Sequence, residues 1–178
     1  IVDAKLENEL SPQADYLLAS EAASAGLVVM SRTQLAAPGE AEAVIDHLNR
    51  ALADCHCARR FGADDVLCQD WNALTTADFA RVDCCGWRQT SYVKLHFDEH
   101  KAFTSLYFLE AGRSVAQVRQ AAQMLLHDAK YGHVLRVKGF IPDGGGWVEL
   151  NAARDAITVQ PIPSGQEVLI VIGEGLDK

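Results

Sequence analysis

The chain has 178 residues, of which 49% are hydrophobic, and it carries a formal net charge of −8. A chain of this length can bury a substantial core in one or two compact domains. The negative charge argues against an electrostatic grip on nucleic acid or on an anionic membrane. The longest wholly apolar run, residues 168–172, is far shorter than the roughly 20 residues that span a bilayer. We therefore expect a cytoplasmic protein with no nucleic-acid or membrane partner.

The first half of the chain predicts a helix, a strand and a second helix. Ser11 can cap a helix over residues 11–25, and Pro12 suits its first position. Residues 27–30 form a continuous apolar run, which is typical of a parallel strand with helices on both faces. Apolar residues then recur at helical spacing over residues 41–52.

After an irregular stretch, a short helix is expected to begin at Thr75, with Asp78 in a capping box. The pattern then changes. In residues 91–98 Val93, Leu95 and Phe97 alternate with polar residues, which predicts a strand with one buried face.

The remainder predicts a mainly antiparallel sheet with one long helix. Ser114 and Gln117 form a capping box ahead of an amphipathic helix that Gly132 is placed to end. Pro and Gly signals separate the expected strands, which cover residues 104–110, 133–141, 147–150, 156–163 and 167–173.

The predicted fold class is therefore α/β followed by α+β. Residues 1–90 would be the end of a parallel, nucleotide-binding type of sheet, and residues 91–178 a second domain built on the antiparallel sheet. One parallel strand does not make a domain, and the sequence opens at Ile1 without an initiator Met. We expect the first sheet to continue upstream in a longer protein.

A polar quartet, residues 31–34, ends the apolar strand abruptly. In open parallel sheets, ligands bind outside the carboxyl ends of the strands, which is where this quartet would lie. The alternative is a plain polar loop that leaves a core strand. Position alone favours that alternative.

Several segments together resemble the later part of the CobW (cobalamin-synthesis protein) family of P-loop GTPases. These are IVDAK, a helix with Gln13 and Ala14, an apolar strand and SRTQL. HVLRVKGFI, a Gly-rich turn and EVLIVIGEGLD resemble the carboxyl-terminal domain of the family. The resemblance spans nearly the whole chain and is strongest over residues 133–178. It places the quartet on the family's guanine-recognition motif, Asn-Lys-x-Asp, with Ser31, Arg32 and Gln34 at the base-binding positions.

The resemblance implies the carboxyl-terminal portion of a metallochaperone that couples GTP and Mg²⁺ to the delivery of zinc or cobalt. Its partners would be the missing amino-terminal GTPase half and a metalloprotein client. The sequence contains no G-x-x-x-x-G-K-[ST] motif to cradle phosphates, so this chain alone is not expected to hydrolyse GTP. The family's Cys-x-Cys-Cys motif would also lie upstream.

The quartet departs from the family motif at three positions. Gln34 replaces an Asp whose carboxylate accepts hydrogen bonds from two guanine N–H groups, which a neutral amide cannot do. Ser31 stands where Asn is usual, and Arg32 where Lys is usual. These departures favour an alternative function, a free-standing protein-interaction module whose nucleotide loop has decayed.

The five cysteines form an odd set with two very close pairs: Cys55, Cys57, Cys68, Cys84 and Cys85. Secreted disulfide frameworks rarely look like this, so reduced thiols are expected. Cys55 and Cys57 offer soft ligands that suit Zn²⁺, although their spacing is tighter than that of structural zinc sites. A thiol-based metal protein is thus a third hypothesis, and small buried thiols are the simpler one.

Arg136 and Lys138 alternate with Leu135 and Val137, so both should point to one side of their strand. By the resemblance, this RVKG stretch is a hallmark of the carboxyl-terminal domain. The two cations would contact the GTPase half or a client, or they would hold the sheet together. The structural role is the favoured interpretation.

Overall fold

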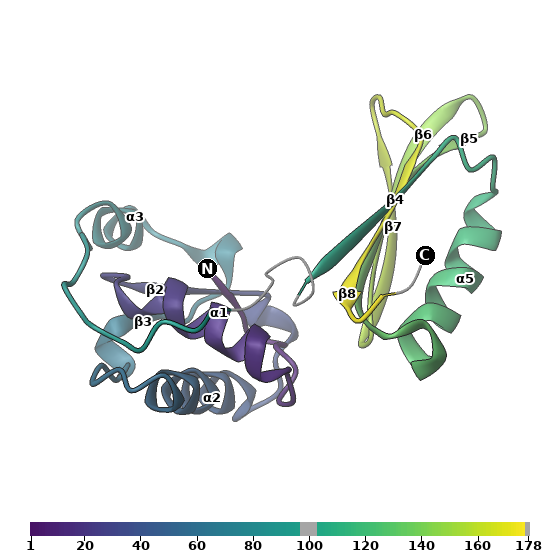
Figure 1. Cartoon of the computed structure of the whole chain (residues 1–178). Helices are drawn as coiled ribbons and strands as arrows, with labels where there is room; N and C mark the ends of the chain where they lie inside the picture. The colour runs from purple at the N-terminus through teal and green to yellow at the C-terminus, as the bar shows by residue number, and fades with distance from the viewer. Residues whose placement is uncertain (97–102, 177–178) are drawn as a thin grey trace. The chain divides into compact units, whose positions relative to one another are not determined.

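The computed structural model describes residues 1–96 and 103–176 of the chain. It divides into two compact units, Ile1–Phe97 and Asp98–Lys178, each of which has its own core (Figure 1). The sequence placed a domain boundary at about residue 90. Within the described residues, none of the helices is long and apolar enough to cross a membrane.

Unit 1 is built on a three-stranded parallel sheet with the strand order β1-β2-β3. The strands are β1 (Val2–Asp3), β2 (Val28–Ser31) and β3 (Val66–Leu67). The helices are α1 (Pro12–Ala23), α2 (Glu40–Asp54) and α3 (Thr76–Asp83). Short 3-10 turns lie at Thr33–Leu35, Ala63–Asp65 and Trp71–Ala73.

The predicted helix starts in unit 1 are confirmed by their caps. The Ser11 hydroxyl accepts a hydrogen bond from the Ala14 N–H at 3.1 Å, and Pro12 occupies the first turn of α1. Thr75 and Asp78 form the reciprocal capping box of α3. These local signals fix the positions at which the helices begin.

Helices α1 and α2 cover the same face of the parallel sheet. Sequential parallel strands joined by right-handed crossovers place their helices on one side. Val28 and Met30 of β2 are buried in the core with residues of both helices, whereas Val29 and Ser31, on the opposite face, are half-buried. The prediction of helices on both faces of β2 is therefore wrong for the described residues.

An extended segment, residues 86–93, is tied to the start of β2 and to the end of α2. The Gly26 N–H donates to the Gly86 carbonyl at 3.2 Å, and the Arg88 N–H donates to the Ser24 carbonyl at 2.9 Å. Farther along, the Val93 N–H donates to the Cys55 carbonyl at 2.8 Å. We call residues 86–93 the strap.

The predicted strand over residues 91–98 is wrong where the structure describes it. Residues 91–96 form no strand, and Val93 and Leu95 are 49% and 50% exposed. At Val93 the chain bonds to the Cys55 carbonyl in the loop after α2, and residues 91–96 join no ladder of the sheet, so Val93 and Leu95 gain no buried face. Phe97 and Asp98 lie outside the described residues.

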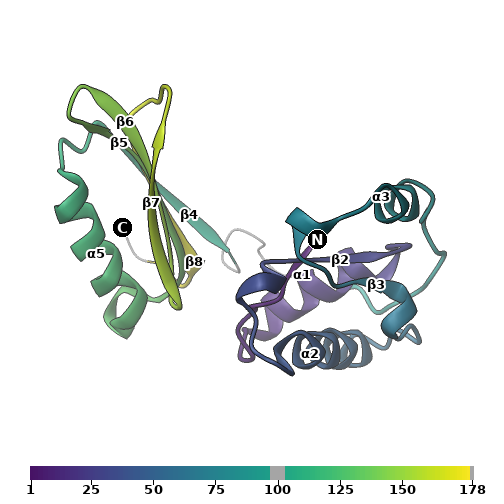
Figure 2. The same cartoon turned by 180° about the vertical axis from the view of Figure 1, so that it is seen from behind.

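Unit 2 is a five-stranded antiparallel sheet with the order β4-β8-β5-β6-β7. The strands are β4 (Thr104–Leu109), β5 (His133–Asp143), β6 (Gly146–Ala153), β7 (Ala156–Ile162) and β8 (Val168–Glu174). Figure 2 shows α5 (Val115–His127) along one face of this sheet. The predicted antiparallel sheet with one long helix is confirmed.

Apolar residues of α5 fill the core against that face of the sheet. Val118, Ala122 and Leu126 pack there with residues such as Val137 and Leu150. We call the opposite side of the sheet the open face. Unit 2 therefore follows the usual rule for antiparallel sheets, in which one face is buried and the other is wetter.

The ends of α5 agree only in part with the sequence prediction. Ser114 and Gln117 form the predicted capping box. The helix ends at His127, because the Asp128 carboxylate accepts the Lys130 N–H and begins a separate 3-10 turn, Ala129–Tyr131. Gly132, the predicted end, follows that turn with a left-handed φ of 85°.

The contact of Gly26 with the strap predicts a large effect of one added methyl group. A Cβ at Gly26 would overlap the backbone carbonyl oxygens of Cys85 and Gly86, whereas a Cβ at Gly62 would meet nothing within 4 Å. We expect Gly26→Ala to lower the free energy of unfolding of unit 1 by about 1–3 kcal/mol. Urea denaturation followed by tryptophan fluorescence measures this. A loss no larger than that of the control Gly62→Ala would contradict the packing described.

Candidate functional site

The carboxyl ends of β1, β2 and β3 meet at one edge of the parallel sheet, which we call the carboxyl edge. Asp3 pairs with Ser31 in the β1–β2 ladder, and Val29 pairs with Leu67 in the β2–β3 ladder. The polar residues that follow each strand are therefore neighbours. Such an edge is the usual ligand-binding position in open parallel sheets.

Arg32 closes the turn that leaves β2. Its backbone is left-handed, with φ 58° and ψ 25°, which is uncommon for a residue other than glycine. Its guanidinium pairs with the Asp3 carboxylate at the end of β1: Nε lies 2.9 and 2.8 Å from the two oxygens, and Nη2 lies 2.8 Å from Oδ2. A forked charged contact of this kind fixes direction as well as distance. The turn after β2 is thus anchored to β1.

A second ion pair crosses the carboxyl edge, between Lys5 and the first residue of α2. The Lys5 ammonium lies 2.9 and 2.8 Å from the carboxylate oxygens of Glu40. Glu40 also accepts the Ala37 N–H at 2.7 Å. Lys5 first and Ala37 second hold the pKa of Glu40 below its ordinary value of 4.5. The loop between β2 and α2 is therefore fastened at both of its ends.

Trp71, in the 3-10 turn that follows β3, contacts the end of β2. Its indole N–H donates to the Met30 carbonyl at 2.8 Å, next to the quartet. The ring remains partly exposed at the edge. An aromatic ring in such a position offers a flat apolar surface beside polar groups.

The base-binding residues predicted from the sequence lie together at this edge. Ser31 is the last residue of β2, Arg32 closes the turn, and Gln34 lies in the 3-10 turn that follows. Ser31 is half-buried and Gln34 is exposed. The Gln34 amide offers one accepting and one donating group to a ligand. Arg32, in contrast, is engaged by Asp3.

Sequence reasoning missed the groups that hold the quartet in place. Asp3, Lys5, Glu40 and Trp71 were not singled out. The sequence did contain a pattern that could have identified Asp3 and Lys5. Both follow the apolar residues Ile1 and Val2, just as the quartet follows the apolar residues 27–30. Glu40 and Trp71 are brought in by the packing of α2 and by the position of β3, which local pattern does not reveal.

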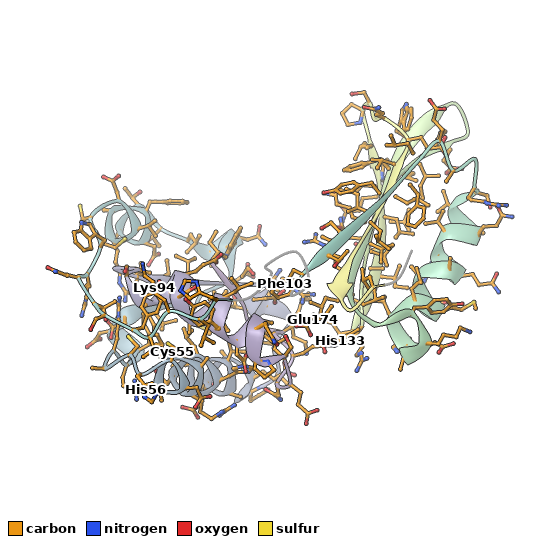
Figure 3. All side chains as sticks on the ribbon, in the orientation of Figure 1. Cys55, His56, Lys94, Phe103, His133 and Glu174 are labelled. Atoms are coloured by element: carbon orange, nitrogen blue, oxygen red, sulfur yellow. The ribbon has the colours of Figure 1, made fainter. Side chains whose placement is uncertain are left out.

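The two candidate metal ligands lie in the turn that follows α2, away from the carboxyl edge. Figure 3 labels Cys55, with His56 beside it. The Cys55 thiol donates to the Leu52 carbonyl at 3.3 Å, and the Cys57 sulfur lies 3.3 Å from the Thr90 hydroxyl. Burial raises the pKa of the Cys55 thiol, which favours the protonated form, whereas metals bind the thiolate.

The other cysteines do not complete a metal site with this pair. Cys68, Cys84 and Cys85 are exposed and Cys55 and Cys57 are buried. Across residues 1–96 and 103–176, no group of three or more His, Cys, Asp or Glu side chains is placed to hold a metal ion. Zinc binding at Cys55 and Cys57 stays a prediction.

The two predicted interface cations of unit 2 lie on its open face. Arg136 Nη2 donates to Asn151 Oδ1 at 2.8 Å, and Lys138 Nζ lies 2.6 Å from a carboxylate oxygen of Glu149. Both partners belong to β6, so the two cations link β5 to β6. A register shift between Val134 and Arg136 interrupts the alternation that the sequence suggested.

No family model matches the sequence, and no curated protein matches it. Two solved structures are similar at a distance. The zinc(II)-bound YjiA GTPase from E. coli is 16% identical with a TM-score of 0.36, and a zinc(II)-bound triple mutant of the YjiA GTPase is 18% identical with a TM-score of 0.35. Each comparison covers 98% of this chain and 55% of the other chain. The chain thus spans about half the length of these proteins.

The pKa of Glu40 predicts how the Lys5 pair depends on pH. A carboxyl whose folded pKa is lowered stabilises the fold above its ordinary value and stops doing so as pH falls through the lowered value. We expect Glu40→Gln to lower the melting temperature near neutral pH, and to lower it less as pH drops below 4.5. The effect is small, because the pair is partly exposed.

Circular dichroism melts over a pH series measure this difference. Glu42→Gln is the matched control, because Glu42 lies in the same first turn of α2 and is exposed. A pH-independent difference between wild type and Glu40→Gln would contradict the ion pair.

Proposed function

We propose that this chain supplies the base-recognition loop and an accessory domain of a CobW-like nucleotide-binding metallochaperone. In this proposal residues 31–34 contact the base, and unit 2 faces a client protein or the rest of the GTPase. The phosphate-binding loop and Mg²⁺ would be held by an amino-terminal half, because this sequence contains no G-x-x-x-x-G-K-[ST] motif. This chain alone would not hydrolyse GTP.

The observation that carries the proposal is the anchored turn after β2. The Arg32–Asp3 contact and the Lys5–Glu40 pair hold both ends of the loop. They leave Gln34 exposed at the edge where parallel sheets bind ligands. A loop that is ordered before binding loses less conformational entropy when a ligand arrives. A loop that only connects β2 to α2 would not need to hold the exposed Gln34 in a fixed position, which supports a binding role for this loop.

The amide of Gln34 sets the base preference in this proposal. Guanine presents two adjacent N–H donors, which a carboxylate accepts and an amide accepts only in part. Guanine affinity would therefore be lower than in a loop that ends in Asp. The proposed metal cargo, zinc or cobalt, follows from the family resemblance and would be carried by the whole protein.

Substitution of Gln34 tests the base site directly. A hydrogen bond to a charged group contributes about 1.5–3 kcal/mol. We therefore expect Gln34→Asp to tighten binding of a guanine nucleotide to the full-length protein by about tenfold or more, and Gln34→Ala to weaken it. Binding of an adenine nucleotide should not tighten in Gln34→Asp. Titration calorimetry with GDP and ADP measures both affinities.

Gln89→Asp is the matched control, because Gln89 is an exposed residue of the strap, which is tied to the start of β2 and to the end of α2. It adds the same charge to unit 1 away from the loop. An equal gain for both bases in Gln34→Asp, or the same gain in the control, would contradict base recognition by Gln34. Absence of any nucleotide binding by the full-length protein would overturn the proposed function.

A second candidate function is a protein-interaction module without nucleotide. The observation that favours it is the open face of unit 2, where Tyr107 and Leu109 are largely exposed, one strand away from Arg136 and Lys138. Ser31 and Gln34 in place of Asn and Asp agree with a decayed nucleotide loop. The nucleotide titration separates the two functions, because an interaction module binds neither GDP nor ADP.

A thiol-based metal site makes its own distinct prediction. If Cys55 and Cys57 hold zinc, the reduced chain binds one zinc ion tightly, and the double substitution Cys55→Ser with Cys57→Ser abolishes that binding. Cys68→Ser, an exposed thiol elsewhere in unit 1, is the control that should retain it. Competition with a zinc-responsive dye measures the affinity. Absence of tight binding by the wild-type chain would remove this hypothesis.

A further inference from the structure

In the part of unit 2 that the structure describes, one edge of the sheet is formed by β4, a strand without charged residues. In the described part of unit 2, β4 has a strand neighbour on one side only, namely β8, with which it pairs without interruption over its six residues. Its sequence, TSLYFL, contains no charge, no Pro and no Gly. Tyr107, Phe108 and Leu109 are 63%, 49% and 64% exposed. Long, flat, apolar edges are templates for pairing with another strand.

The ladder with β8 determines which backbone groups of β4 point outward. Beyond Leu109 the Glu110 N–H donates to the Glu167 carbonyl at 3.4 Å, so Glu110 takes part in the pairing with β8. Residues directly opposite each other in an antiparallel pair alternate between bonded and non-bonded. The backbone groups of Ser105, Tyr107 and Leu109 are therefore the ones that turn away from β8.

The other edge of the sheet is protected in a way that β4 is not. Strand β7 contains Pro161, opposite Val148, and proline has no N–H to donate. Arg154 and Asp155 precede the strand in the turn from β6. Pairing of β4 with β7 of another molecule would extend into an open filament. Pro161 opposes that arrangement. Pairing of β4 with β4 of a second copy, in contrast, forms a symmetric dimer that has no tendency to extend.

We propose that β4 pairs with β4 of a second copy of this chain, antiparallel, about a two-fold axis through Tyr107. This register places Tyr107 opposite Tyr107 of the second copy, and Ser105 opposite Leu109 of the second copy. The outward backbone groups then meet as three hydrogen-bonded pairs. Leu106 and Phe108 also come to lie opposite each other, which is a favourable cross-strand pairing.

Charge favours a second copy as the partner. Residues 98–178 contain eight basic and ten acidic side chains, so this unit is nearly neutral although the whole chain has a net charge of −8. No charge lies within β4 to oppose its counterpart across the two-fold axis. Two copies of unit 2 can therefore approach each other with little electrostatic repulsion. Most of the negative charge of the chain lies in residues 1–97, where self-association would be opposed more strongly.

The area available indicates a weak dimer. A fully buried aromatic side chain covers about 150–250 Å², so complete burial of the exposed parts of Tyr107, Phe108 and Leu109 would remove at most about 300 Å² per copy from water. The total of about 600 Å² is below the roughly 1,200 Å² of stable interfaces. Association should therefore be visible only as a concentration-dependent equilibrium. A permanent dimer is not expected.

Sedimentation equilibrium of the whole chain over a range of concentrations tests the proposal. We expect a monomer–dimer equilibrium that Tyr107→Lys weakens at least tenfold, because two lysines then face each other at the axis. Leu109→Lys should weaken it less, since its opposite residue is Ser105. Gln160→Lys, an exposed position on β7, is the matched control and should leave the equilibrium unchanged.

Three results would overturn the proposal. A chain that stays monomeric at all concentrations has no such pairing. An equilibrium that is insensitive to Tyr107→Lys uses another surface, and equal loss in Gln160→Lys would place the contact on β7. Far-UV circular dichroism of each variant verifies that the sheet is intact, and the large exposure of Tyr107 makes this the expected result.

Discussion

The parallel pairing of β2 with both of its neighbours is the constraint on which unit 1 depends. It aligns three strand ends at one edge, so that Asp3 meets Arg32 and the Trp71 indole reaches the Met30 carbonyl. The same pairing sends both crossover helices to one face, where they form the core with Val28 and Met30. The geometry of the carboxyl edge is thus a consequence of topology together with two ion pairs.

Unit 2 solves a different physical problem. An antiparallel sheet with one helix has a covered face, an open face and two edges. The open face exposes side chains to water, and the edges expose unpaired backbone groups. Pro161 blunts one edge, and Lys138 with Glu149 places a charge pair on the open face. Among the strands that the structure describes in unit 2, β4 combines an edge position with largely exposed apolar side chains. This asymmetry is the reason to regard β4 as a contact surface.

Local signals were sufficient to predict most elements of the fold. The caps at Ser11, Thr75 and Ser114 mark helix starts that depend on neighbouring residues alone. The strand expected at residues 91–98 is absent over residues 91–96, because an alternating pattern does not reveal whether a ladder partner exists. Val93 instead bonds to Cys55, a contact between segments that are far apart in sequence.

The candidate site was only half predictable. Position after a strand identified the quartet, whereas its supports arise from packing. Glu40 is placed by the docking of α2, and Trp71 by the pairing of β3. The coverage of β2 was also mispredicted, because an apolar run of four residues does not say how many faces are covered by helices.

We propose above that the carboxyl edge of unit 1 recognises a nucleotide base. The most direct measurement is an NMR titration of the full-length protein with a guanine nucleotide, in which the residues of this chain are isotope-labelled and their backbone amide and indole signals are followed. We expect shifts centred on Ser31, Arg32, Gln34 and the Trp71 indole. Unchanged signals at saturating nucleotide, or shifts confined to unit 2, would contradict it.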